Sequence, residues 1–210
     1  MRILITAGPT REPIDPVRYI GNRSSGKMGA ALTQAALTAG HQVTVILGPV
    51  SVLYPNAARW IDVESSAEML AAVVREFPNH DLLIMAAAVA DYRPVAASAA
   101  KISREGSLTL QLETTPDIVA EAGRLKRPDQ RTVGFSLETA ADEDRVRGKM
   151  RQKNLDLIVY NPMQTVSSDS IEPILFYPDG RVEKLPSRGK AEFADILLQR
   201  AAELFRGKSL

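Results

Sequence analysis

The sequence predicts an α/β fold of the Rossmann-like type, with a mostly parallel sheet and helices on both faces. Two observations support this prediction. Apolar runs at residues 2–6, 42–47 and 81–86 alternate with segments at 26–39 and 66–77 that repeat apolar residues at helical spacing. The first two runs end near Gly-Pro, a pair typical of turns. Buried strands joined by helical crossovers form parallel sheets, with helices packed on either side.

The length and charge of the chain fit one domain. It has 210 residues, of which 45% are hydrophobic and 24% charged, and its formal net charge is +1. That length suits a single α/β domain, and the balanced charge provides no overall field to attract nucleic acid or acidic lipid. We found no repeat, low-complexity tract or linker. We therefore predict one domain over residues 1–210, with a flap at about residues 93–115.

The residue types that are rare in the chain exclude several chemistries. There is no cysteine, so disulfides, thiolate metal sites and cysteine nucleophiles are excluded. The two histidines, His41 and His80, fall at predicted helix-to-strand junctions, and no histidine pair stands with a carboxylate at metal-ligand spacing. No apolar run is long enough to span a membrane or to act as a signal peptide. We therefore expect a cytoplasmic protein that binds neither membranes nor nucleic acid.

The second half returns to the α/β pattern after an excursion that we expect to be mobile. Residues 107–113 alternate apolar and polar side chains, which predicts an exposed or half-covered strand. Thr115, Pro116 and Asp117 have the pattern of a helix start, with Thr115 as the N-cap and Pro116 at the first helical position. The remaining predicted elements are a strand at 131–135, a helix at 142–153, a strand at 155–160, a hairpin from 171–176 and 181–184, and a closing helix at 189–205.

The connection after the first strand is the clearest functional signal. It is roughly 17 residues long, and loops of that length are usually functional. It ends in Ser24, Ser25 and Gly26 at a helix start, where hydroxyls and backbone N–H groups can bind an anion. Neither the dinucleotide glycine pattern nor the P-loop order is present. A surface Ω-loop with solvated charges remains the structural alternative. The polar residues of the connection include Arg11, Glu12, Asp15, Arg18 and Asn22.

The third strand ends in alanines followed by Asp91. Strand carboxyl ends face the ligand crevice in open α/β sheets, and alanines such as Ala87 and Ala88 let a ligand approach the backbone. Asp91 could bind Mg²⁺, a ribose hydroxyl or a cation. Tight helix–sheet packing, with Asp91 as a cap, is an equally open alternative.

The sequence indicates a ligand-binding role less clearly for three lysines. Lys101 follows an alanine-rich stretch and could swing over a polyphosphate, although a solvated surface lysine fits the residues as well. Lys149 and Lys153 stand four apart on one predicted helix and so share a face. A basic face near a helix C-terminus is also favourable without any ligand.

Together these segments resemble the phosphopantothenoylcysteine synthetase family of the coenzyme A pathway. In many bacteria this synthetase is the C-terminal half of a bifunctional protein whose N-terminal half is a flavin-dependent decarboxylase. The similarity runs in order along nearly the whole chain. The matching segments are ITAGPTREPIDPVRYI at 5–20, Asn22 with SSGKMG at 24–29, AAVADYR at 87–93, TPDIV at 115–119, VGF at 133–135 with Glu138 and Thr139, and KNLDLI at 153–158.

The resemblance implies a ligase that works in two steps. CTP first activates the carboxylate of 4′-phosphopantothenate as an acyl-cytidylate and releases pyrophosphate. The amine of L-cysteine then attacks the acyl carbon and expels CMP. A divalent cation, Mg²⁺ or Mn²⁺, is expected as cofactor. The residues fit this kind of reaction, which depends on positioning and anion binding more than on proton transfer.

The resemblance also implies roles for particular residues. Asn22 would contact the acyl group, Ser24, Ser25 and Gly26 would contact phosphate, and Asp91 would serve the nucleotide site and hold the metal. Lys101 would be the first lysine of a closing flap, where the family motif K-x-K-K is here Lys101-Ile102-Ser103-Arg104. Further nucleotide contacts would come from Ala87, Ala88, Pro116, Asp117, Ile118, Val119, Phe135, Lys149 and Lys153, the last two toward the base.

The expected assembly of the protein also follows from the resemblance. The resemblance implies a homodimer, for which an exposed edge near residues 108–112 is our candidate. It also implies a flavin-dependent decarboxylase as partner, with this chain either a stand-alone synthetase or an excised half. CTP and ATP are not distinguished by the sequence.

A nicotinamide-dependent reductase is a second hypothesis for the function, disfavoured by the missing glycine pattern and the missing Tyr-x-x-x-Lys pair. A non-catalytic nucleotide-binding module is a third.

Overall fold

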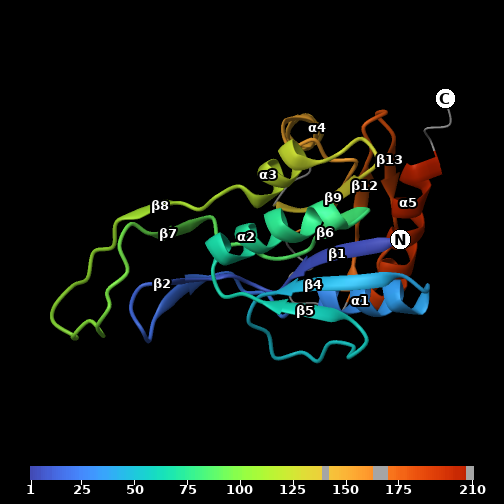
Figure 1. Ribbon diagram of the computed structural model, residues 1–210. Helices are drawn as coiled ribbons and strands as arrows, with labels where there is room; N and C mark the ends of the chain where they lie inside the picture. The colour runs from blue at the N-terminus through green and yellow to red at the C-terminus, as the bar shows by residue number, and fades with distance from the viewer. Residues whose placement is uncertain (139–141, 163–169, 207–210) are drawn as a thin grey trace.

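The computed structural model describes residues 1–138, 142–162 and 170–206 (Figure 1). Its centre is an eight-stranded sheet in the order β13-β12-β10-β9-β6-β1-β4-β5. The strands from β5 to β10 are parallel, and the hairpin of β12 and β13 adds an antiparallel edge. This confirms the predicted fold class. The strands are β1 (Arg2–Ala7), β4 (Gln42–Leu47), β5 (Arg59–Asp62), β6 (Leu82–Met85), β9 (Arg131–Glu138), β10 (Leu157–Pro162), β12 (Ile174–Phe176) and β13 (Val182–Lys184).

The order of the parallel strands locates the ligand crevice. Numbered along the chain, β5, β4, β1, β6, β9 and β10 follow the order 3-2-1-4-5-6 of doubly wound nucleotide-binding sheets. The order reverses between β1 and β6, which pair directly in parallel. Loops diverge there above the carboxyl ends of the strands, so this is where such sheets bind ligands.

Helices cover both faces of the sheet. One face is covered by α1 (Lys27–Thr38) and α5 (Lys190–Arg206), which lie side by side. The other is covered by α2 (Ser66–Glu76), with the short 3-10 helix Phe77–Asn79 after it, α3 (Ile118–Leu125) and α4 (Glu143–Gln152).

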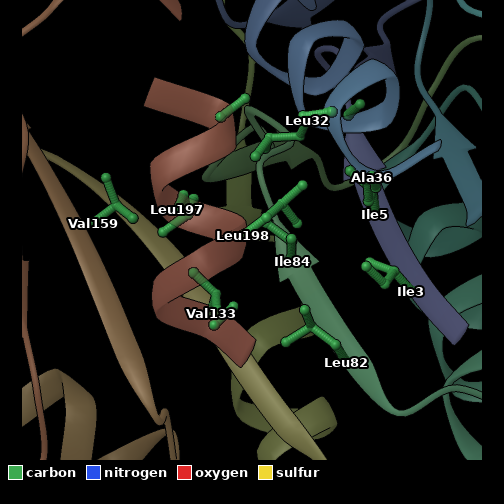
Figure 2. Packing of buried hydrophobic residues seen from close by; sticks show 14 of the residues in the cluster. Ile3, Ile5, Leu32, Ala36, Leu82, Ile84, Val133, Val159, Leu197 and Leu198 are labelled. Atoms are coloured by element: carbon green, nitrogen blue, oxygen red, sulfur yellow. The ribbon is translucent and has the colours of Figure 1, made fainter. Parts of the chain in front are cut away.

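The alternation of side-chain direction along each strand divides the core into two layers, one on each face of the sheet. Successive strand residues point to opposite faces. Ile3 and Ile5 therefore pack under α1 and α5, whereas Leu4 packs with α2 and α3. Figure 2 shows the first layer, in which side chains of α1 and α5 pack on those of the strands.

Two antiparallel ribbons project from the carboxyl edge of the sheet (Figure 1). One joins β2 (Arg11–Pro13) to β3 (Tyr19–Gly21), so the long connection after β1 is a hairpin and not an irregular loop. The other joins β7 (Tyr92–Pro94) to β8 (Leu112–Thr114). The predicted strand at 107–113 is therefore mostly wrong: only its last residues pair, because β7 is three residues long. A third ribbon joins β11 (Ser170–Ile171) to β14 (Arg188–Gly189).

Other boundaries differ from expectation for local reasons. Helix α3 begins at Ile118, with Asp117 as its N-cap accepting from the Ala120 N–H at 3.0 Å. The predicted N-cap Thr115 is instead bonded to Ala90 and Asp91. Strand β5 was not predicted, because its sequence Arg-Trp-Ile-Asp has no apolar run.

The two histidines have structural contacts. His80 is buried, and its ring nitrogens contact the Glu76 carbonyl at 2.7 Å and the Thr44 hydroxyl at 2.9 Å. Nδ1 of His41 lies 3.4 Å from the N-terminal amine nitrogen. Burial, together with the positive charge of that amine, lowers the pKa of His41. Among the helices described, none is long and apolar enough to cross a membrane.

Candidate functional site

Thr10 joins the connections that follow β1 and β6 at the point where the strand order reverses. Its backbone N–H donates to the Ala88 carbonyl at 3.3 Å, and its hydroxyl accepts from the Ala90 N–H at 2.9 Å. The side chain is fully buried. Thr10 therefore ties the start of the connection after β1 to the alanine segment. It lies within a segment quoted for the family resemblance, but its role was not predicted.

Asn22 lies against the alanine segment. Its Nδ2 donates to the Val89 carbonyl at 2.8 Å. An amide nitrogen has two hydrogens, so one remains for a ligand, together with the acceptor Oδ1. The hydrogen bond fixes the orientation of an otherwise exposed side chain. Asn22 and Val89, which come from connections far apart in sequence, thus meet at the crevice.

In the turn at Ser24, Ser25 and Gly26, the backbone lies very close to a neighbouring side chain. Gly26 is the N-cap of α1 and has φ of 76°, a left-handed conformation that favours glycine. A Cβ on Gly26 would lie 2.6 Å from Val50 Cγ1. The Ser24 hydroxyl accepts from the Gly26 N–H at 3.4 Å.

Tyr54 holds this turn through a hydrogen bond. Nothing in the spacing of the sequence indicated this role for Tyr54. Its hydroxyl donates to the Gly26 carbonyl at 2.8 Å. Burial raises the pKa of Tyr54, so the hydroxyl keeps the proton that it donates.

Two cavities flank the turn, and both are lined by Arg23, Ser24 and Ser25. The first, which we call the sheet-edge cavity, measures about 220 Å³. It is lined by Ser24, Ser25, Gly26, Ala87, Ala88 and Phe135, all predicted as nucleotide or phosphate contacts, and also by Lys27, Ser136, Asn161 and Lys190. The second, the ribbon cavity, measures about 340 Å³ and is lined by Thr10, Arg11, Tyr19, Asn22, Val50 and Ser51 among others.

The charged side chains at these cavities are cationic. Lys27, Lys190 and the shared Arg23 line the sheet-edge cavity, and Arg11 lines the ribbon cavity with its guanidinium 4.6 Å from the centre of the Tyr19 ring. No aspartate or glutamate is among the described residues that line either one. Such a charge distribution favours anionic ligands. Two adjacent cationic cavities could hold two anions on either side of Arg23 and the two serines, which line both.

A second group of predicted residues lies at the start of α3, outside both cavities. Lys153 forms an ion pair with Asp117 at 2.9 Å. Burial opposes ionisation of Asp117, but the Ala120 N–H and the Lys153 ammonium outweigh it and lower its pKa. Thr115 connects this start to the crevice, since its hydroxyl donates to the Ala90 carbonyl at 2.6 Å and its N–H to the Asp91 carbonyl at 3.0 Å. The other predicted members are Pro116, Ile118, which is buried in the core, Val119, and Lys149 on α4.

Lys101 lies on the projecting β7–β8 ribbon and lines neither cavity. The adjacent residue is docked on the turn of the β2–β3 ribbon. The Ile102 N–H donates to Asp15 Oδ2 at 3.2 Å, and Arg18 donates to the Ile102 carbonyl at 3.1 Å. The structure thus places the flap on a carboxylate–guanidinium pair, Asp15 and Arg18. The role of Lys101 in closure stays a prediction.

Replacing Asp15 with Asn should loosen the flap. Burial disfavours its charge, but N–H groups of Val17, Arg18 and Ile102 and the Arg18 guanidinium outweigh this and lower the pKa of Asp15. Its contribution to stability is therefore complete above the ordinary value of about 3.9 and is lost as the pH falls through the lowered value. We expect faster amide hydrogen exchange at Ile102 in Asp15→Asn. Unchanged exchange there, or an equal change in the exposed control Asp62→Asn, would contradict this role.

Asp91 could hold a divalent cation only together with a ligand. Within residues 1–138, 142–162 and 170–206, no group of three or more histidine, aspartate or glutamate side chains could hold a metal ion. Mg²⁺ is commonly held by one or two carboxylates with substrate phosphates completing its coordination. An exposed carboxylate directly after the alanine segment fits that arrangement.

Comparison with known proteins identifies a matching family. Residues 1–205 match the family described as DNA/pantothenate metabolism flavoprotein C-terminal domain. The coenzyme A biosynthesis bifunctional protein CoaBC of Vibrio cholerae is 44% identical over 204 residues, covering 94% of this chain and 51% of that protein. The chain spans about half the length of the curated relatives it matches.

Solved structures are similar over the whole fold. The C-terminal domain of a CoaBC protein matches with a TM-score of 0.85 and 38% identity, covering 98% of this chain and 95% of that one. A Cab2 mutant in complex with phosphopantothenate-cysteine shares the fold, with a TM-score of 0.77 at 18% identity over 100% of this chain and 89% of its own. The family match, the identity and the shared fold agree, and the chain belongs to the family of the DNA/pantothenate metabolism flavoprotein C-terminal domain.

Proposed function

We propose that this chain is a phosphopantothenate–cysteine ligase of coenzyme A biosynthesis that uses CTP. The observation that carries the proposal is the sheet-edge cavity, which brings together the turn at Ser24–Gly26, the pair Ala87–Ala88 and Phe135. These come from the connections after β1 and β6 and from strand β9, and they are the residues expected to contact nucleotide and phosphate. Membership of the family and the CoaBC relatives support the same activity.

The proposed reaction has two balanced steps. A carboxylate oxygen of 4′-phosphopantothenate attacks the α-phosphorus of CTP, and the bond to pyrophosphate breaks. The amine of L-cysteine then attacks the acyl carbon, the bond to the CMP oxygen breaks, and the nitrogen loses a proton. In both steps negative charge moves between oxygens, so fixed cations and N–H donors supply most of the catalysis.

The residues of the crevice suit these steps. Asn22 lines the ribbon cavity, with one amide hydrogen held by the Val89 carbonyl and the other available to the acyl oxygen. The turn at Ser24–Gly26 offers N–H groups and hydroxyls to phosphate at the start of α1, where the helix dipole favours negative charge. A bound Mg²⁺ or Mn²⁺ would neutralise phosphate charge, and Asp91 would hold it.

We also propose that the chain forms a homodimer, as the family resemblance implies, and that the protein is located in the cytoplasm. The two ribbons expose apolar side chains to solvent, with Val17 62%, Val95 56% and Leu108 55% exposed. Burying such a surface between two copies would stabilise the dimer. A flavin-dependent decarboxylase, fused or separate, would supply the companion activity.

The activity can be tested by the release of pyrophosphate. With CTP, Mg²⁺ and L-cysteine present, we expect pyrophosphate to appear only when 4′-phosphopantothenate is added, together with CMP in equal amount. Turnover with ATP and not CTP would contradict the nucleotide while leaving the ligase in place. Nucleotide binding without any turnover would instead favour a non-catalytic module, and tight NADPH binding would favour a reductase.

A further inference from the structure

The ribbon cavity brings an arginine next to the residue expected to hold the acyl group. Arg11 is the first residue of β2 and pairs with Gly21, the last residue of β3, and Asn22 follows Gly21 directly. Arg11 and Asn22 both line the ribbon cavity, and neither lines the sheet-edge cavity. A small ligand in the ribbon cavity can therefore reach the guanidinium of Arg11 and an acyl group at Asn22 together.

The guanidinium of Arg11 is oriented by an aromatic ring. Tyr19 stands two residues before Gly21, so its side chain is the diagonal neighbour of Arg11 across the ribbon. The central carbon of the guanidinium lies 4.6 Å from the centre of the Tyr19 ring, and Tyr19 lines the same cavity. A guanidinium stacked on a ring uses its flat face, so the N–H donors at its edge stay available to a ligand. No aspartate or glutamate is among the described residues of this cavity, so these donors suit an anion.

The position of Asn22 distinguishes between two candidate anions. Once the acyl-cytidylate has formed, the remaining anionic groups of the other substrates are the phosphate derived from 4′-phosphopantothenate and the carboxylate of the amino acid. That phosphate stands at the opposite end of its molecule from the acyl carbon, so it lies away from Asn22. In an α-amino acid a single carbon separates the amine from the carboxylate. An amine that attacks an acyl group at Asn22 therefore brings its carboxylate to the same cavity, where a planar guanidinium can bind both of its oxygens.

We infer that the ribbon cavity binds the amino-acid substrate and that Arg11 binds its α-carboxylate. The inference rests on the proposed function, since it takes the acyl group to be held at Asn22. Pro49 and Val50 line the same cavity and supply apolar surface for a small side chain that carries a thiol. The positive charges of Arg11 and Arg23 also favour the uncharged amine over the ammonium. The uncharged amine is the form that attacks, after its extra proton has passed to solvent.

The test compares L-cysteine with cysteamine, which has the same amine and thiol but no carboxylate. We expect Arg11→Gln to lower kcat/KM for L-cysteine by about tenfold or more, the size of a charge-assisted contact. The value for cysteamine, and KM for CTP and for 4′-phosphopantothenate, should stay at the level of wild type. Arg11→Lys should recover part of the loss, because lysine keeps the charge but cannot bind both carboxylate oxygens in the same plane.

The matched control is Arg181→Gln. Arg181 is also an arginine stacked on a tyrosine, with its guanidinium carbon 3.6 Å from the centre of the Tyr177 ring. It lines neither cavity, so its replacement should leave kcat/KM for both amines unchanged. The control removes the same charge and the same kind of ring contact at a place where we expect no substrate.

The outcomes separate this inference from the proposed function. An equal fall for L-cysteine and cysteamine in Arg11→Gln would overturn the inference, because Arg11 would then only support the ribbon. An unchanged value for L-cysteine, or a rise in KM for 4′-phosphopantothenate alone, would overturn it as well. These results leave the ligase in place, which fails only if wild type makes no product. In that case an NMR titration with L-cysteine decides: binding that is lost in Arg11→Gln upholds the site, and no binding to wild type overturns it.

Discussion

Asn22→Asp should let the acyl-cytidylate form but block its conversion to product. As cysteine attacks, negative charge grows on the acyl oxygen, and the free amide hydrogen of Asn22 can donate to it. A carboxylate cannot donate, repels that charge, and loses the bond to the Val89 carbonyl. Removal of one such donor typically lowers kcat by about 100-fold or more. The first step should continue, because the turn and the cationic side chains of the sheet-edge cavity remain.

The measurement is a single-turnover experiment with both steps followed. Pyrophosphate should be released in an amount near that of the enzyme, and acyl-cytidylate should accumulate while 4′-phosphopantothenoylcysteine does not. Asn79→Asp is the matched control, since Asn79 is exposed at the end of the 3-10 helix Phe77–Asn79, before β6. Product formation at the wild-type rate in Asn22→Asp would refute the assigned role.

Gly29→Ala should destabilise the protein more than an ordinary helix substitution. Gly29 lies in the first turn of α1 where the helix crosses β1, and a Cβ there would lie 2.3 Å from Ala7 Cβ and 2.7 Å from the Tyr54 hydroxyl. The helix must move away from the strand, which costs about 1–3 kcal/mol in a packed core. The shift would also displace Tyr54 and with it the turn at Gly26, so CTP affinity should fall as well.

The matched control is Gly148→Ala in the middle of α4. No atom lies within 4 Å of a Cβ added to Gly148, so the substitution keeps only the gain in helix propensity, about 1 kcal/mol. The two substitutions are chemically identical and should shift the midpoint of thermal unfolding in opposite directions. If Gly29→Ala were as stable as wild type, α1 would not pack on β1 as closely as the structure shows.

The fold was predictable because its signals are local. The strands at β1, β4 and β6 are continuous apolar runs, and α1 and α2 repeat apolar residues at helical spacing. The ribbons were not predictable in the same way. Their strands are three residues long and largely exposed, so pairing is decided by partners distant in sequence. The hairpin at β12 and β13 was predicted, whereas Ile171 belongs to β11 and not to it.

The residues of the candidate site likewise divide into those that sequence motifs predicted and those that they did not. The serines, Gly26, the alanines and Asn22 were found from motifs because each lies directly after a strand or at a helix start. Thr10 and Tyr54 were not found, since their roles depend on hydrogen bonds to Ala88, Ala90 and Gly26 across the fold. Thr139, one residue of the family segments, lies outside the described part of the chain.

The sequence by itself determined the class of fold, the family and the turn at Asn22–Gly29, because these depend on neighbouring residues and on ordered motifs. Only the tertiary structure decided what shares a cavity with that turn. It separated Lys101, Asp117 and Lys153 from the two cavities and brought Lys190 into one of them. The physical reason is that a cavity is formed by strand ends and helix starts that meet in space, so its charge depends on topology and not on spacing along the chain.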